Sequence, residues 1–141
     1  GEATVVVAEL IGAVVDWNRG PLAHLAGSPL DDPRVSVRLG DIARSLQTEL
    51  EEYDGILLDV DNGPEGLTRD SNDWLYSSEG LAASYSALRP GGTLAVWSAT
   101  PEKSFAMRLE KIGFKVREVR VPADCGDPRE RDVIWLAAKP A

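Results

Sequence analysis

The 141 residues are enough for one domain with a sizeable core and too few for two. Hydrophobic residues make up 43% and charged residues 27%, which excludes a disordered, collagen-like or membrane-embedded chain. A net charge of -8 repels phosphate backbones and anionic lipid, so we expect neither nucleic acid nor a membrane as a partner. With one cysteine, Cys125, one histidine and no signal-peptide pattern, we expect a cytoplasmic protein without a disulfide or a bound metal.

The first strand is predicted at residues 3–8, a β-branched run without polar alternation that ends at Glu9. Apolar spacing predicts a helix from residue 11 to about residue 26, interrupted near Gly20 and the proline that follows. Residues 35–39 alternate between polar and apolar side chains, as a strand does, and Asp41 is placed to cap the next helix, which runs to about residue 50.

A second apolar strand is predicted at residues 53–60 and leads into a polar, glycine-bearing loop. Ser77 or Ser78 is placed to cap a helix that stops at residues 89–92, before a buried strand at residues 93–97. The remaining elements are predicted as a helix at about 101–112 and strands at 115–121 and 132–138.

This alternation predicts an α/β fold with a doubly wound, mostly parallel sheet, helices on both faces and an antiparallel hairpin at its carboxyl-terminal edge. We take residues 1–141 as a single domain. In such sheets, ligands bind beyond the carboxyl ends of the strands, where Glu9, Asp41, Asp59 and Asp61 stand. Each carboxylate taken alone fits a helix cap or a solvated loop equally well, whereas together they favour a nucleoside pocket.

Several stretches resemble spermidine synthases, the polyamine aminopropyltransferase branch of the class I S-adenosylmethionine-dependent methyltransferase fold. The resemblance covers almost the entire chain. Its strongest parts are the Asp-Pro-Arg-Val and Gly-Asp segment and the Tyr-Asp-x-Ile-x-x-Asp strand, because each joins a strand pattern to a polar residue at its end. The stretches are residues 5–10 (VVVAEL), 32–41 (DPRVSVRLGD), 53–59 (YDGILLD), 75–76 (LY) and 88–92 (LRPGG).

The resemblance implies a cofactor, S-adenosylmethionine or its decarboxylated form, and an amine substrate. By it, Glu9 holds the cofactor's ribose, Asp41 and Ile42 contact the adenine, and Asp59 binds cofactor and substrate and accepts a proton from the attacking amine. Substrate-binding positions are expected at Asp61, Trp74 and Tyr76.

Two departures from the family pattern set further expectations. The loop reads Asp59-Val-Asp-Asn-Gly-Pro64, where spermidine synthases usually carry Asp-Ser-x-Asp-Pro. The family's amino-terminal β-rich region, first strand and glycine loop are not among these residues, so we expect a partial domain that is inactive on its own. The missing strand would leave two central edges unpaired, through which we expect a homodimer or larger homo-oligomer. Two alternatives stay open: methyl transfer to a small molecule, and a non-catalytic remnant that acts as a binding or assembly module.

Overall fold

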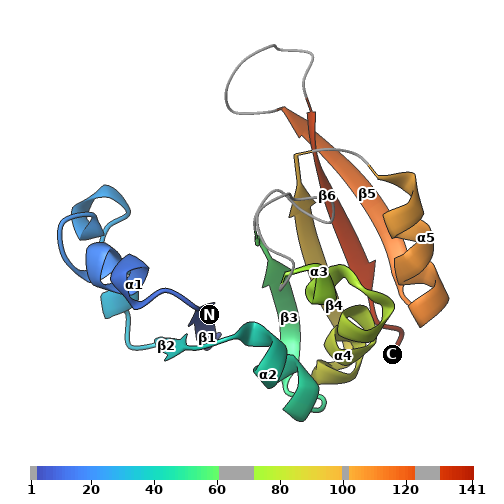
Figure 1. The fold of residues 1–141 in the computed structure, drawn as a ribbon, viewed down its shortest axis with the longest axis horizontal. Helices are drawn as coiled ribbons and strands as arrows, with labels where there is room; N and C mark the ends of the chain where they lie inside the picture. The colour runs from blue at the N-terminus through green and yellow to red at the C-terminus, as the bar shows by residue number, and fades with distance from the viewer. Residues whose placement is uncertain (1–2, 61–71, 100–101, 123–130) are drawn as a thin grey trace. The chain divides into compact units, whose positions relative to one another are not determined.

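The computed structural model describes residues 3–60, 72–99, 102–122 and 131–141, whose helices and strands alternate as predicted (Figure 1). The chain divides into two compact units, Gly1–Ser45 and Leu46–Ala141, and each is described by itself. That both belong to a single domain stays a prediction. None of the helices in the described ranges is long and apolar enough to cross a membrane.

The first unit is built around two parallel strands. Strand β1 (Val5–Glu9) pairs with β2 (Val35–Leu39) in register from Val5 opposite Val35 to Glu9 opposite Leu39. Between them lie α1 (Gly12–Arg19) and two short 3-10 turns, η1 (Ala23–Leu25) and η2 (Pro29–Asp31). The predicted interruption near Gly20 is confirmed, because the Gly20 amide donates to the carbonyls of Asp16 and Trp17 and ends α1. Helix α2 (Ile42–Thr48) follows β2.

The second unit carries a four-stranded sheet in the order β3-β4-β6-β5. Strands β3 and β4 are parallel, whereas β6 runs antiparallel to both β4 and β5. The predicted carboxyl-terminal hairpin is therefore confirmed, but the sheet is mixed, not mostly parallel. Strand β6 lies between β4 and β5 and pairs with each of them in the antiparallel direction. The strands are β3 (Tyr53–Leu58), β4 (Leu88–Ser98), β5 (Lys115–Pro122) and β6 (Arg131–Ala138).

Three helices accompany this sheet: α3 (Asp73–Tyr76), α4 (Ser78–Ala87) and α5 (Lys103–Ile112) (Figure 1). The predicted cap is confirmed at Ser77, whose hydroxyl oxygen accepts from the Gly80 amide at 3.1 Å. Helix α5 ends at Gly113, where a φ of 116° places the backbone in the left-handed region that glycine adopts without strain.

Alternate residues of the second sheet form the core against α4 and α5. Leu94, Val96, Val133 and Trp135 are fully buried, and Phe105 of α5 packs edge-on against Trp135 with ring centroids 4.8 Å apart. On the opposite face the side chains are half-buried, among them Trp97 of β4 and Ile134 of β6. Within the second unit the described helices thus cover one face of the sheet, and helices on both faces stay a prediction.

Strand β4 begins earlier than predicted. Residues 89–92 were expected to end a helix, yet the strand already starts at Leu88, which lies opposite Tyr53 of β3. Pro90 disfavours helical geometry at the residue before it, so the backbone extends there. The Gly92 carbonyl then accepts from the Lys139 amide at 2.8 Å, which holds the early part of the strand against the end of β6.

Among the described residues, four strands have an open edge within their own unit: β1, β2, β3 and β5. Within these ranges β1 pairs only with β2, and β3 pairs only with β4. The edges of β1 and β3 are those expected to be unpaired. Leu57, one residue before the end of β3, is 81% exposed, an unusual position for a leucine in a parallel strand.

Candidate functional site

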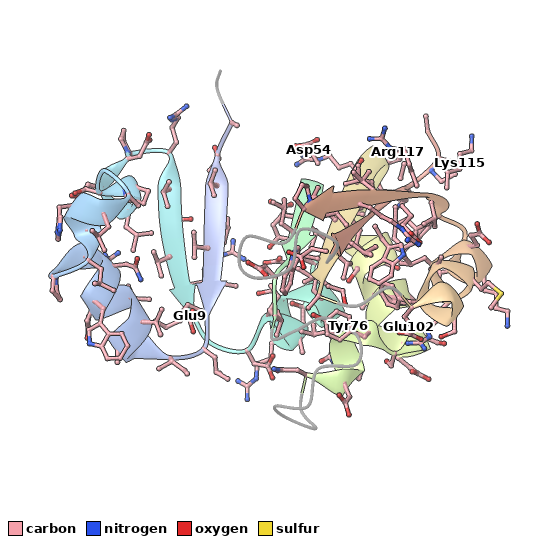
Figure 2. The ribbon with its side chains drawn as sticks, turned by 90° about the horizontal axis from the view of Figure 1, so that it is seen from above. Glu9, Asp54, Tyr76, Glu102, Lys115 and Arg117 are labelled. Atoms are coloured by element: carbon pink, nitrogen blue, oxygen red, sulfur yellow. The ribbon has the colours of Figure 1, made fainter. Side chains whose placement is uncertain are left out.

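Glu9 stands at the carboxyl end of β1, as predicted (Figure 2). Its Oε1 accepts a hydrogen bond of 2.8 Å from the amide of Ile11, the residue that precedes α1. This contact engages Oε1, while Oε2 has no partner among the described residues. A carboxylate held by one oxygen can still accept hydrogen bonds through the other.

Asp41 follows the neighbouring strand β2 and caps α2. Its Oδ1 accepts from the Ala43 amide at 2.9 Å, which satisfies one of the amides that a helix leaves unpaired in its first turn. The Gly40 amide donates to the Glu9 carbonyl at 2.9 Å, so the two strand ends are joined directly. The predicted placement of Glu9 and Asp41 on one edge of a parallel sheet is therefore confirmed.

An open pocket of about 520 Å³ lies beside these strand ends, entirely within the first unit. Its lining comes from both strands, from the residues that follow them and from the start of α2, and it includes Asp41 and Ile42. Glu9 is not among the residues that line it. The lining residues are Ala8, Leu10, Arg38, Leu39, Gly40, Asp41, Ile42, Arg44 and Ser45.

Sequence reasoning missed the two arginines and Leu10 in this pocket. Arg38 lies in β2, Leu10 directly follows β1, and Arg44 lies in the first turn of α2. Their positions next to Glu9 and Asp41 in the sequence were the available signal. An apolar wall with polar groups around it is the usual character of a small-molecule site.

The other predicted residues belong to the second unit. Asp59 is exposed directly after β3, and Trp74 is half-buried in α3. Tyr76 is buried, and its hydroxyl donates to the Val60 carbonyl at 2.7 Å. Tyr76 thus lies against the chain next to Asp59. Asp61 and Cys125 lie outside the described residues.

The Asp-Pro-Arg-Val segment forms a tight ionic turn before β2. Asp32 accepts from the Arg34 amide at 2.9 Å and from two atoms of its guanidinium, at 3.0 Å for Nε and 2.7 Å for Nη2. The side-chain bonds, followed by the amide, lower the pKa of Asp32 below its ordinary value. The segment therefore sets the turn that leads into β2.

Replacing Asp32 by asparagine is expected to lower Tm slightly near pH 7. The sign follows from the lowered pKa of Asp32: its contribution is present above the ordinary aspartate pKa and is lost as pH falls through the folded-state pKa. The Tm difference between Asp32→Asn and the unmodified chain should therefore disappear in strong acid. Asp31→Asn, at an exposed neighbour, is the control; a difference that persists unchanged at low pH would contradict the ionic origin.

Solved spermidine synthases share this fold. The enzyme from Thermotoga maritima superposes with a TM-score of 0.77 at 21% identity, covering 96% of this chain and 45% of the other. A spermidine synthase in complex with the transition-state analogue AdoDATO gives 0.77 at 20% identity, covering 96% and 46%. A probable spermidine synthase from Corynebacterium glutamicum gives 0.67 at 17% identity, covering 94% and 46%.

A methyltransferase has the same fold. The didemethyltoxoflavin N1-methyltransferase of Burkholderia thailandensis, with bound S-adenosylhomocysteine, gives a TM-score of 0.60 at 18% identity, covering 97% of this chain and 61% of the other. The fold is thus shared by both kinds of transferase. This chain spans less than half the length of the spermidine synthases it matches. The spermine/spermidine synthase domain model matches residues 3–119, and the chain belongs to that family.

Proposed function

We propose that this chain is part of a transferase that moves an aminopropyl group from decarboxylated S-adenosylmethionine to an amine. The family supports this chemistry. The observation that carries the nucleoside part is the junction of β1 and β2, where Glu9 ends β1, Asp41 follows β2 and the Gly40 amide links the two parallel strands. Carboxylates at this edge of a parallel sheet are well suited to bind a ribose and a base.

The residues present in the first unit fit a nucleoside. Glu9 keeps Oε2 without a partner among the described residues, so it can accept from ribose hydroxyls. Asp41 and Ile42 both line the pocket, where Asp41 can accept from an exocyclic amino group and Ile42 can pack on a flat ring. We therefore propose Glu9 for the ribose, and Asp41 with Ile42 for the adenine.

In the second unit we propose Asp59 as the proton acceptor and as a contact for cofactor and amine. When bound, the cofactor supplies a sulfonium group that activates the carbon to be transferred. Asp59 is exposed at the end of β3, where its negative charge attracts a cationic amine and can take up the proton released by the nitrogen. Trp74 and Asp61 are proposed to contact the same substrate.

Calorimetric titration tests this function. The chain, and a version extended at its amino terminus, are titrated with S-adenosylmethionine, its decarboxylated form and methylthioadenosine. The proposal expects the decarboxylated form to bind tightest. Tighter binding of S-adenosylmethionine would favour methyl transfer, and no binding of any of the three would favour a binding or assembly module.

We also propose that copies of this chain associate through the open edges of β1 and β3. An unpaired strand edge offers a row of backbone donors and acceptors to another chain, and Leu57 adds an exposed apolar side chain on β3.

Leu57→Lys is expected to weaken self-association about tenfold, because lysine on an edge strand opposes pairing with another edge. Sedimentation velocity over a range of protein concentrations measures the effect. Leu50→Lys is the matched control, since Leu50 is 72% exposed but lies outside every strand. A monomer at all concentrations of the unmodified chain would contradict the proposal.

A further inference from the structure

The end of β3 is fastened by a buried tyrosine. Tyr76 is only 3% exposed, and its hydroxyl donates to the Val60 carbonyl at 2.7 Å. The carbonyl belongs to the residue directly after Asp59, and the two partners lie 16 positions apart in the sequence. A hydrogen bond between such distant residues restrains the backbone at the point where the strand ends.

Tyr76 is itself held by α5. Its ring meets the Phe105 ring edge-on, with centroids 6.1 Å apart and planes at 73°. Its backbone carbonyl accepts from Nη1 of Arg108 at 2.7 Å. The hydroxyl and the carbonyl of one residue are thus both engaged, one by the strand end and the other by the helix.

Arg108 is oriented in turn by two groups of its own helix region. Its Nη2 lies 3.5 Å from Oε1 of Glu102, and its guanidinium carbon lies 5.7 Å from the centroid of the Phe105 ring. Glu102 immediately precedes α5, and Arg108 bridges Glu102 and the Tyr76 carbonyl. The planar guanidinium can serve a carbonyl, a carboxylate and an aromatic face at once, which lysine cannot.

We infer that Tyr76, Arg108 and Glu102 form a clamp that holds the backbone next to Asp59 and so positions its carboxylate. The inference rests on the proposed role of Asp59. A proton acceptor must lie within hydrogen-bond reach of the reacting nitrogen, and a misplacement of about 1 Å costs on the order of 100-fold in rate. The Asp59 side chain is exposed. The clamp restrains the Asp59 backbone through the hydrogen bond to the carbonyl of the next residue, Val60.

The clamp makes Tyr76 a positioning residue for the strand end. A tyrosine that forms a substrate wall would present its hydroxyl to the amine, whereas this hydroxyl is directed at the Val60 carbonyl. The two roles differ in what Tyr76→Phe changes: loss of the clamp alters the strand end in the absence of any ligand.

The first experiment compares Tyr76→Phe with Tyr85→Phe by NMR of the labelled chain. Tyr85 is the matched control because it lies in α4 and its ring packs edge-on against Phe114. In Tyr76→Phe the Val60 carbonyl carbon should shift, and amide exchange at residues 58–60 should accelerate about fivefold or more relative to the core of β4. Equal effects of both variants at residues 58–60 would overturn the clamp, as would a uniform acceleration throughout the second unit.

The second experiment replaces Arg108 by glutamine and by lysine. Arg108→Gln should accelerate exchange at residues 58–60 as Tyr76→Phe does, and Arg108→Lys should restore part of the protection, because an ammonium group can still donate to the Tyr76 carbonyl. Arg120→Lys is the control, since Arg120 pairs with Glu118 on the exposed face of β5. No change at residues 58–60 in Arg108→Gln would contradict the inference.

A titration of the same samples with 1,4-diaminobutane separates the clamp from the proposed function. If the clamp and the function both hold, the diamine shifts the Asp59 signals in the unmodified chain. In Tyr76→Phe the same shift should need a diamine concentration at least about fivefold higher. If the diamine has no effect on the unmodified chain while the Val60 carbonyl still responds to Tyr76→Phe, the proposed function fails and the clamp stands as a restraint on the strand end.

Discussion

Replacing Phe105 by alanine is expected to lower the free energy of unfolding of the second unit by about 3–5 kcal/mol. Phe105 is fully buried and contacts aromatic rings on two sides, Tyr76 at 6.1 Å and Trp135 at 4.8 Å between centroids. The truncation removes both edge-to-face contacts and leaves a cavity between α5 and the sheet. Urea denaturation followed by circular dichroism measures the loss.

Met107→Ala is the matched control for that measurement. Met107 lies in the same helix and is 56% exposed, so its truncation should change the free energy of unfolding by no more than about 0.5 kcal/mol. Similar losses in both variants would mean that α5 contributes through helix formation and not through the packing of Phe105. A loss confined to Phe105→Ala would place the stability of the second unit in its aromatic core.

The elements themselves were largely predictable because their signals are local. The strand at residues 35–39, the cap at Ser77 and the helix end at about residue 112 agree with the structure, since alternation, a hydroxyl side chain and the glycine after a helix act over a few residues. The start of β4 was not predictable in this way. Leu88 is a strand residue because it lies opposite Tyr53, and that pairing depends on a chain segment far away.

The mixed sheet shows the same limit at the level of topology. The apolar sequence of β6 fits a strand with a neighbour on each side, and the alternating charges of β5 fit an edge strand. The hairpin was therefore predictable, but the sequence does not say that β6 lies between β4 and β5 and joins β4 in an antiparallel pair.

The candidate site likewise contains residues that could be predicted from the sequence and contacts that could not. Glu9 and Asp41 could be found because strand ends carry function in this type of sheet and because the family pattern falls on them. The contact of Tyr76 with Val60, and of Arg108 with Tyr76, joins residues 16 and 32 positions apart. Such contacts arise only when α3, α5 and the end of β3 are packed, so no spacing rule predicts them.

Replacing Glu9 by glutamine tests the nucleoside site with little risk to the fold. The amide oxygen of glutamine can still accept from the Ile11 amide, so the start of α1 is preserved, while the negative charge is removed. Hydrogen bonds to a charged acceptor contribute about 1.5–3 kcal/mol, so affinity for the nucleoside should fall about tenfold to a hundredfold.

Methylthioadenosine is the suitable probe, since it presents a ribose and an adenine without the cationic sulfonium that any nearby carboxylate would attract. Calorimetric titration of Glu9→Gln is compared with that of Asp16→Asn, which removes an exposed carboxylate from α1 and so controls for the loss of one negative charge. A loss of affinity specific to Glu9→Gln means that the carboxylate contacts the ribose. Equal affinities in the two variants and the unmodified chain would remove Glu9 from the site, because a charge next to the ribose hydroxyls cannot be neutralised without weakening binding.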